Sequence, residues 1–137
     1  KNFTFHRYFS YSFSMRTLFI IPLLLFSLFL NMNSYSEDFH KGMNALLDDD
    51  YAKALKEFKP LAEQGHRGAQ YFLGVMYYKG YGVDKDFVYA HMWWNIAASN
   101  GVDNGNKNKV EEMMTASDIS EAQKFARECV KKNYKGC

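Results

Sequence analysis

Residues 69–101 read AQYFLGVMYYKGYGVDKDFVYAHMWWNIAASNG. Apolar residues recur at the spacing of one buried helix face over residues 69–77, and again after Asp86. Between these two stripes lie Gly80 and Gly82, which can adopt a positive φ at little steric cost. The stretch therefore predicts two helices joined by a loop that contains glycine.

The stripe after Asp86 recurs on both sides of this stretch. An offset of 36 residues aligns it with a segment that begins at Asp50, and an offset of 32 aligns it with one that begins at Asp118. Aspartate is favoured at a helix N-terminus, and glycine is favoured just beyond a helix C-terminus, where Gly65 and Gly101 end two of the stripes. Each copy therefore predicts one helix with a buried face.

A shorter apolar segment precedes each of these helices, so the chain divides into helical hairpins at roughly 38–65, 67–101 and 106–134. Val110 and Met113–Met114 form the apolar face of the first helix in the third hairpin, and Pro60 should kink or tighten the first long helix. No segment alternates as a strand does, so the sequence predicts an all-α fold. Because one hairpin cannot bury its own stripe, the three should stack as a short α-solenoid.

The central hairpin resembles a Sel1-like repeat, which is a TPR-like unit. The residues that carry the resemblance occur at the family's spacing and are Ala69, Leu73, Gly74, Tyr77, Gly80, Gly82, Val83, Asp86, Ala90, Trp93, Ala97, Ala98 and Gly101. The flanking hairpins match this pattern only in part. The resemblance implies a right-handed α-solenoid of about three hairpins with a scaffold or adaptor role, and it implies no shared catalytic residues.

The motif residues also have physical roles that do not depend on the family. Gly74 would let two helices pack backbone to backbone, and Val83 would close the inter-helix loop against the core. Trp93 offers the largest single burial of apolar surface, worth about 2–3 kcal/mol. We therefore expect Gly82→Val and Trp93→Ala to unfold the domain rather than to remove only its function.

Residues 15–36 have the three zones of a secretory signal. Arg16 supplies the positive charge, residues 18–30 form an uncharged apolar run, and Ser34 and Ser36 precede a cleavage point. As a helix the apolar run would span about 20 Å, whereas a bilayer core is roughly 30 Å thick. We therefore expect a cleaved signal rather than a membrane span, with an uncleaved N-terminal anchor as the alternative.

Cleavage would leave residues 37–137 as the folded domain, in the periplasm or outside the cell. Residues 1–14 precede Met15, where a normal signal would start, and are expected to be an unfolded upstream extension. A long positively charged region of the signal is the alternative for these residues.

Cys129 and Cys137 are the two cysteines of the chain. In an exported protein, two thiols this close are expected to form a disulfide, which would fold the C-terminal residues back onto the last helix. Closing so short a loop stabilises a fold by about 2–3 kcal/mol in the chain-entropy model. The spacing also resembles the cysteine pairs of cysteine-rich secreted members of the family. A buried thiol at Cys129 or a metal site are the alternatives, and zinc is disfavoured because no His lies nearby in sequence.

The charge of the folded part does not indicate a nucleic-acid partner. Residues 37–137 carry 14 basic and 15 acidic side chains, and no basic run occurs among them. The sequence also lacks a phosphate-binding glycine loop, a Ser-x-x-Lys nucleophile in the folded part and a His-Glu-x-x-His metal motif. We therefore expect neither a cofactor nor a metal ion.

The histidines and the acidic run of the folded part are assigned structural roles. His91 is expected to lie half-exposed on a helix, and His66 is expected to be solvated in a turn. Asp48–Asp50 are interpreted as a solvated turn with a helix cap, because the spacing lacks the alternation and the distal Glu of a calcium loop.

These patterns predict a module that binds another protein and is not an enzyme. The first helices of stacked hairpins line the concave face and usually carry the contacts. Tyr71 and Tyr78 lie off the buried stripe of their helix and Tyr81 lies in the loop, so all three are candidates to anchor a partner. Packing against neighbouring hairpins is the alternative for them.

The rival function is a hydrolase that acts on cell-wall material or β-lactams, since some cysteine-rich secreted members of the family have been associated with β-lactams. A small structural or inhibitory domain is a third alternative. Weak self-association would also cover the apolar edges of so short a stack.

Overall fold

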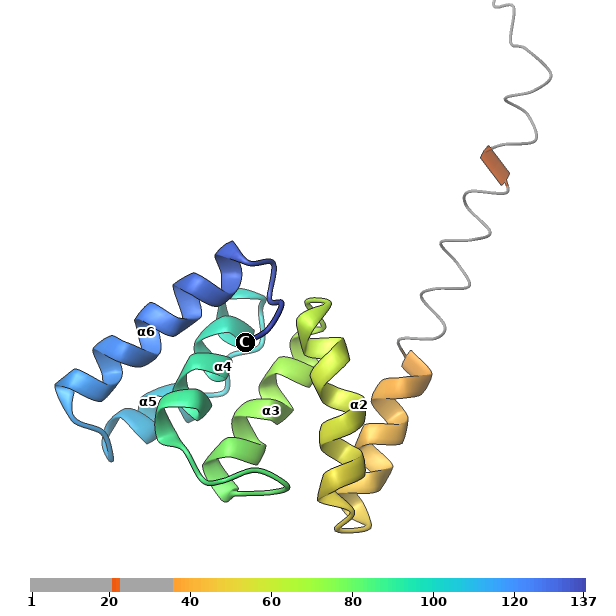
Figure 1. Ribbon diagram of the computed structural model, residues 1–137, viewed down its shortest axis with the longest axis horizontal. Coiled ribbons are helices and arrows are strands. Elements are labelled where there is room, and N and C mark those ends of the chain that lie inside the picture. The colour runs from red at the N-terminus through yellow and green to blue at the C-terminus, as the bar shows by residue number, and fades with distance from the viewer. Residues whose placement is uncertain (1–20, 23–35) are drawn as a thin grey trace, which may run out of the picture. The chain divides into compact units, whose positions relative to one another are not determined.

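The described secondary structure is helical throughout. In the computed structural model, residues 21–22 and 36–137 are described, so residues 1–14 and most of the predicted signal at 15–36 lie outside the described part. Residues 36–137 belong to one compact unit, and residues 21–22 belong to a separate N-terminal unit. The helices of the compact unit are residues 36–47, α2 (Tyr51–Glu63), α3 (Arg67–Lys79), α4 (Phe87–Ser99), α5 (Asn106–Glu111) and α6 (Ala116–Lys131). They follow one another as three hairpins (Figure 1), and the predicted all-α repeat fold is confirmed.

Three helices begin where the aspartates predict. The side chains of Asp50 and Asp86 cap α2 and α4 by accepting hydrogen bonds from backbone N–H groups three residues later, at 3.2 and 3.0 Å. Asp118 lies in the first turn of α6 and forms a capping box with Thr115, in which each side chain accepts a hydrogen bond from the backbone N–H of the other. Local sequence therefore sets these helix starts.

Glycines with a positive φ end the helices and shape the inter-helix loop. Gly65 and Gly101 have φ values of 85° and 89° just beyond α2 and α4, as predicted. Gly82 has a φ of 70°, and a Cβ atom at this position would lie 2.8 Å from the backbone oxygen of Tyr51. Gly82 therefore brings the loop of the second hairpin onto the start of α2, which couples the first two hairpins.

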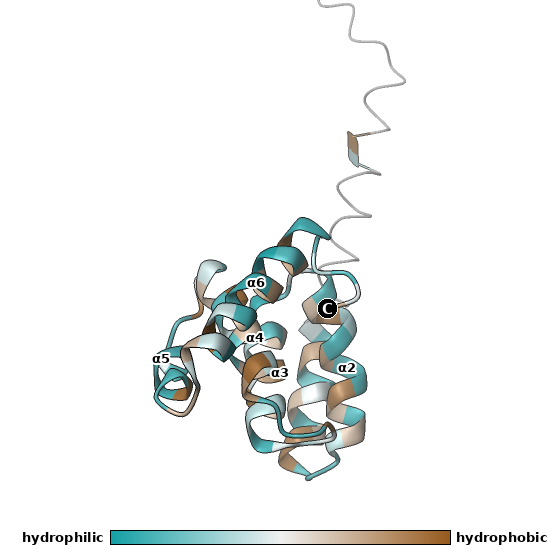
Figure 2. Ribbon diagram, turned by 60° about the vertical axis from the view of Figure 1, so that its left-hand side comes forward, coloured by the Kyte–Doolittle hydropathy of each residue, from teal (hydrophilic) through white to brown (hydrophobic). Residues whose placement is uncertain are grey.

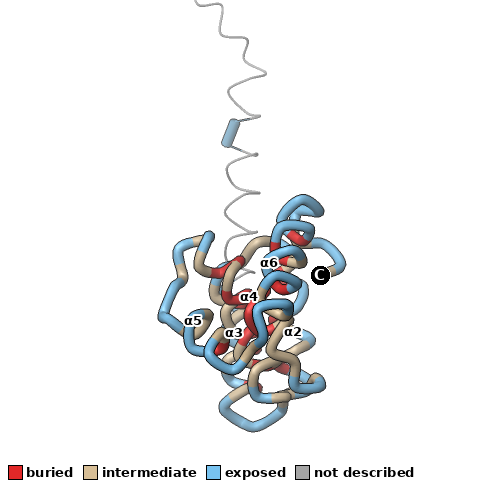
Figure 3. The backbone as a smooth tube through the Cα atoms, turned by 90° about the vertical axis from the view of Figure 1, so that its left-hand side faces the viewer, coloured by how far each residue is buried: buried red, intermediate tan, exposed pale blue. Residues whose placement is uncertain are grey.

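The central helix of the stack is α4. It packs against α3, α5 and α6, whereas α2 packs against α3. Figure 3 shows buried backbone gathered in α3 and α4, and Figure 2 shows mainly hydrophilic residues over the visible part of α6. The buried residues of α4 are Ala90, His91, Met92, Trp93, Trp94, Ile96 and Ala97. With neighbours on several sides, α4 is therefore buried around most of its circumference.

The motif residues of the central hairpin lie in or against this core. Five of them are at most 2% exposed, namely Ala69, Leu73, Ala90, Trp93 and Ala97. Tyr77 is half-buried and stacks on Tyr89 with ring centroids 5.1 Å apart. Val83 packs against the main buried cluster, as its predicted role in closing the loop requires.

The predicted backbone-to-backbone packing at Gly74 is wrong. A Cβ atom at Gly74 would lie 2.5 Å from both Cδ1 and Nε1 of Trp94. The glycine therefore makes room for an indole ring rather than for a neighbouring backbone. Trp94 is 5% exposed and forms a second buried cluster with Ala90 and Val110.

Two further boundaries differ from the predicted pattern. Helix α5 ends at Glu111, so Met113 and Met114 lie in the turn before α6 rather than on a helical face. Helix α2 continues through Pro60 for three more residues. Pro60 has no N–H to donate to the carbonyl of Lys56, so α2 lacks one internal hydrogen bond near its end and still continues to Glu63.

Candidate functional site

A pocket of about 290 Å³ lies between α3, α4 and α5. Its lining comes from one face of α3 (Tyr71, Val75, Tyr78 and Lys79), from Trp94 of α4, and from Asn106, Lys109 and Val110 of α5. Since α3 and α5 are the first helices of the second and third hairpins, the pocket lies on the helices that the sequence assigned to partner contacts.

Trp94 forms the inner wall of this pocket. The missing side chain at Gly74 lets the indole lie against α3. Its Nε1–H donates a hydrogen bond of 3.1 Å to the backbone oxygen of Tyr71, which belongs to α3. Because the indole is almost fully buried and its N–H is hydrogen-bonded, Trp94 is held rigidly at the inner wall of the pocket.

Tyr71 joins α3 to α5 at one end of the pocket. Its hydroxyl oxygen accepts a hydrogen bond of 3.1 Å from the side-chain amide of Asn106, and its ring packs edge-on against Phe72 at 5.2 Å. Tyr71 is half-buried, so part of its ring remains open to the pocket. Tyr71 therefore packs against the neighbouring hairpin, which was the alternative role, and it also lines a surface hollow.

Tyr78 lies beside lysines and other aromatic rings. Its ring centroid lies 5.6 Å from that of Phe87 and 5.5 Å from that of Trp94. The ammonium groups of Lys79 and Lys85 lie 5.5 and 5.9 Å from the same centroid, within the range of a cation–π interaction. Two positive charges therefore lie close to this side of the pocket.

The predicted exposure of Tyr81 is wrong. The ring is half-buried and stacks on Tyr51, with centroids 4.1 Å apart and an angle of 6° between the ring planes. The hydroxyl of Tyr51 donates a hydrogen bond of 2.6 Å to Asp49, and this bond raises the pKa of Tyr51 to about 12. Tyr81 thus belongs to the contact between the first two hairpins and does not line the pocket beside Tyr71 and Tyr78.

The structure also corrects the expectations for two histidines. His91 is fully buried rather than half-exposed, and its Nε2 lies 2.6 Å from a carboxylate oxygen of Glu111 on α5. His66 caps α3 by accepting a hydrogen bond from the backbone N–H of Ala69 through Nδ1 at 3.1 Å, and its ring lies 4.7 Å from that of Phe39. Desolvation by this packing lowers the pKa of His66.

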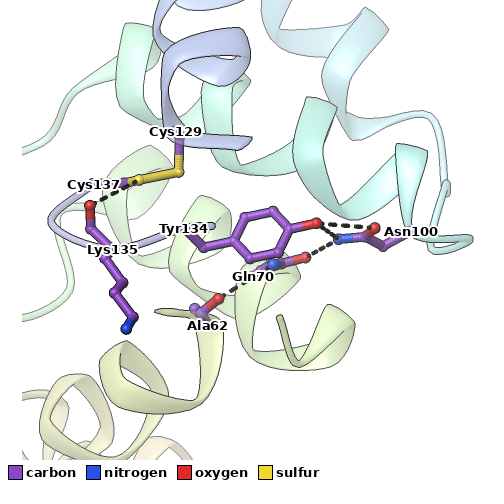
Figure 4. The surroundings of a disulfide bond; sticks show 7 residues. All are labelled: Ala62, Gln70, Asn100, Cys129, Tyr134, Lys135 and Cys137. Carbon is purple, nitrogen blue, oxygen red and sulfur yellow. Dashed lines mark hydrogen bonds between the residues drawn. A yellow bond between two sulfur atoms is a disulfide. The ribbon is translucent and has the colours of Figure 1, made fainter. Parts of the chain in front are cut away.

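The C-terminal residues fold back onto the stack. The Sγ atoms of Cys129 and Cys137 lie 2.09 Å apart in a disulfide, and Figure 4 shows Tyr134 reaching from this loop towards Asn100 and Gln70. The hydroxyl of Tyr134 accepts a hydrogen bond of 3.4 Å from Asn100, whose amide also donates to buried Gln70 at 2.8 Å. This network connects the third hairpin to the second.

Gln70 extends the same network to the first hairpin. Its amide donates a hydrogen bond of 3.2 Å to the backbone oxygen of Ala62 at the end of α2. The ring of Tyr134 also lies beside Gly65, where a Cβ atom would come within 3.3 Å of it. The sequence offered no signal for this network beyond the cysteine pair, because polar residues carry no periodicity of their own.

The acidic residues at the start of α2 have structural partners. Asp50 caps α2 and Asp49 accepts from Tyr51, and no group of three or more potential metal ligands occurs in the described part of the chain. Within residues 21–22 and 36–137, no helix combines the length and the hydropathy needed to cross a membrane.

Comparison with known proteins finds a matching repeat family and a similar solved structure. The sequence model of the Sel1 repeat matches residues 68–102. A protective antigen that displays an SLR fold and is present in uropathogenic Escherichia coli strains is similar in structure, with a TM-score of 0.66 and 31% sequence identity. The match covers 73% of this chain and 23% of the antigen, so the chain spans less than a quarter of that protein's length. No curated protein gave a significant match.

Proposed function

Because the chain is a Sel1-like repeat protein with a helical-repeat fold, we propose that it is an exported scaffold that binds another protein and catalyses no reaction. The observation that carries the proposal is the pocket between α3 and α5, with Tyr71, Tyr78 and Trp94 in its lining. Tyrosine and tryptophan are enriched among residues that dominate binding energy, especially in preformed hollows.

The size of the pocket is compatible with a protein partner. Small-molecule sites usually have volumes of about 300–1,000 Å³. A hollow of about 290 Å³ lies at the lower end of this range and is large enough for one or two side chains of a partner.

Export is supported by the cysteine pair. Disulfides persist in the periplasm and outside the cell, and are rare in reducing compartments. The Cys129–Cys137 geometry and the signal expected at residues 15–36 are therefore consistent with each other.

The hydrolase alternative gains no support from the one His–carboxylate pair found in residues 36–137. The ring of His91 is fully buried beside Glu111, so a substrate could not reach it to exchange a proton. Purified protein is expected to leave a chromogenic β-lactam intact, and turnover that is lost in a Glu111→Gln variant would overturn this part of the proposal.

The binding proposal is tested by photocrosslinking in cells that make the full chain. A benzophenone amino acid replaces Asn108, which is exposed on α5 next to the pocket-lining Lys109, or Lys56 on the exposed side of α2 as a matched control. Irradiation should join the Asn108 variant to one other protein, identified by mass spectrometry, and should not join the Lys56 variant to it. No adduct at either position, or the same adducts at both, would contradict the proposal.

A further inference from the structure

We propose that the pocket between α3 and α5 binds an acidic segment of the partner protein, which inserts one large apolar or aromatic side chain against Trp94. This inference rests on the proposed function and adds to it the chemical class of the ligand. Three features carry it: the apolar side chains at the floor of the pocket, its positive rim, and the structural roles of two neighbouring acidic groups.

The floor of the pocket is preformed and contains apolar side chains, although polar groups make up more than half of the exposed lining. Val75 of α3 and Val110 of α5 line the pocket together with Trp94. Val110 is fully buried and Trp94 is 5% exposed, so both are fixed by packing before a ligand arrives. A rigid wall of this kind lowers the ordering cost of binding and favours a large apolar or aromatic side chain.

The rim of the pocket is positive. Lys79 and Lys109 line it from opposite helices, and Lys85 lies nearby with its ammonium group 4.8 Å from the Phe87 ring centroid. None of the described residues that line the pocket is acidic. Charges of one sign around a hollow attract a ligand of the opposite sign and speed its association.

Two of the acidic groups close in sequence to this rim have partners in the fold, whereas Asp84, which precedes Lys85, is exposed. Glu111, which follows Val110, lies 2.6 Å from the buried ring of His91. Asp86, which follows Lys85, caps α4 through the backbone N–H of Tyr89. Glu111 and Asp86 therefore have structural roles that hold them to α4, while the ammonium groups of Lys79 and Lys85 contact aromatic rings rather than carboxylates.

Tyr71 adds a hydrogen-bond donor to this charge pattern. The Asn106 amide donates to the Tyr71 hydroxyl oxygen, which leaves the hydroxyl hydrogen for another acceptor. A carboxylate of the partner would accept from this group and from a lysine ammonium. The donors of the pocket therefore match an acidic residue next to the inserted side chain.

The test is a selection from a display library of random twelve-residue peptides on the immobilised full chain. Peptides that also bind a Tyr71→Ala/Tyr78→Ala variant are removed. The peptides that remain should combine a net negative charge with a single large apolar or aromatic residue. If they are neutral or basic, the acidic ligand is excluded while the pocket stays a binding site. If none remain, the pocket as a peptide site is excluded as well.

Charge reversal supplies the matched control for a selected peptide. The double variant Lys79→Glu/Lys109→Glu should bind the selected peptide about tenfold more weakly at low salt, and the difference in Kd should shrink at high salt. Lys56→Glu/Lys59→Glu makes the same change in net charge on α2 and should leave the Kd within about twofold, because screening limits the effect of distant charges. Equal losses in both double variants would mean that net charge, rather than the rim of the pocket, selects the peptide.

Discussion

The fully buried imidazole of His91 lies with its Nε2 2.6 Å from a carboxylate oxygen of Glu111. The two residues join α4, the central helix, to α5, which has only six residues and no side-chain cap at its N-terminus. So short a helix is not stable by itself. The position of α5, and with it one wall of the pocket, therefore depends on this contact and on the burial of Val110.

Glu111→Ala should destabilise the domain by about 1–3 kcal/mol, because it leaves a buried imidazole without its hydrogen-bond partner. Glu111→Gln keeps a polar partner at this position and should cost less. Glu112→Ala changes the neighbouring, exposed residue and serves as the control. Urea unfolding measures the stability of all three variants. An equal loss in the alanine variants at 111 and 112 would show that the His91–Glu111 contact does not stabilise the domain.

Gly74→Ala should destabilise the domain by about 1–3 kcal/mol, although alanine is the better helix former, because the new methyl group overlaps Trp94. In a Trp94→Ala background the overlap is gone, and the same change should be neutral or stabilise by up to about 1 kcal/mol. Thermal or urea unfolding of the wild type, the two single variants and the double variant gives the coupling energy between residues 74 and 94. The same loss in both backgrounds would refute the assignment of Gly74 to the indole.

Stability should fall as the pH drops below about 6.5, in part because of His66. Packing lowers the pKa of His66 in the folded state, so the unfolded state takes up the proton first. Protonation also removes the Nδ1 acceptor that caps α3. His66→Asn keeps a capping side chain that does not titrate, and its melting temperature should fall less between pH 7.5 and pH 5 than that of the wild type. A His66→Asn variant whose melting temperature falls as much as that of the wild type over this pH range would contradict the role of His66.

Reduction of the Cys129–Cys137 disulfide should lower the free energy of unfolding by about 2–3 kcal/mol, the amount expected for so short a loop. It should also weaken the contact of Tyr134 with Asn100. Melting curves with and without dithiothreitol check this, and the Cys129→Ala/Cys137→Ala double variant should not respond to the reductant. If the melting temperature of the wild type does not change with dithiothreitol, the C-terminal loop is held in place without the disulfide.

The parts of the fold that the sequence predicted are those set by neighbouring residues. Asp50 and Asp86 cap helices with N–H groups three residues away, and Gly65 and Gly101 need a positive φ whatever surrounds them. Repetition of such signals every thirty-odd residues was enough to predict stacked hairpins.

The residues that sequence reasoning misplaced depend on contacts between distant parts of the chain. His91 seemed half-exposed because a helix was assumed to have one buried face, whereas α4 is surrounded by three other helices. The role of Gly74 depends on a ring twenty residues later, and that of Tyr81 depends on Tyr51 in the preceding hairpin.

The sequence predicted some residues of the candidate site and missed others. Tyr71 and Tyr78 stood out because they lie off the buried stripe of α3, and both line the pocket. Asn106 and Lys109 gave no signal, because a short polar helix has no pattern that separates a pocket wall from a solvated surface. The positive rim of the pocket becomes visible only when α3 and α5 are brought together.

The central claim is that a partner occupies the hollow over Trp94. Fluorine NMR of the protein labelled with 5-fluorotryptophan tests it most directly, because the chain has two tryptophans and a Trp94→Phe variant assigns their signals. Trp93 is 2% exposed and lies in the other buried cluster. Addition of the partner protein that the crosslinking experiment identifies should shift the Trp94 signal and leave the Trp93 signal in place. A saturated complex in which the Trp94 signal does not move would contradict the account.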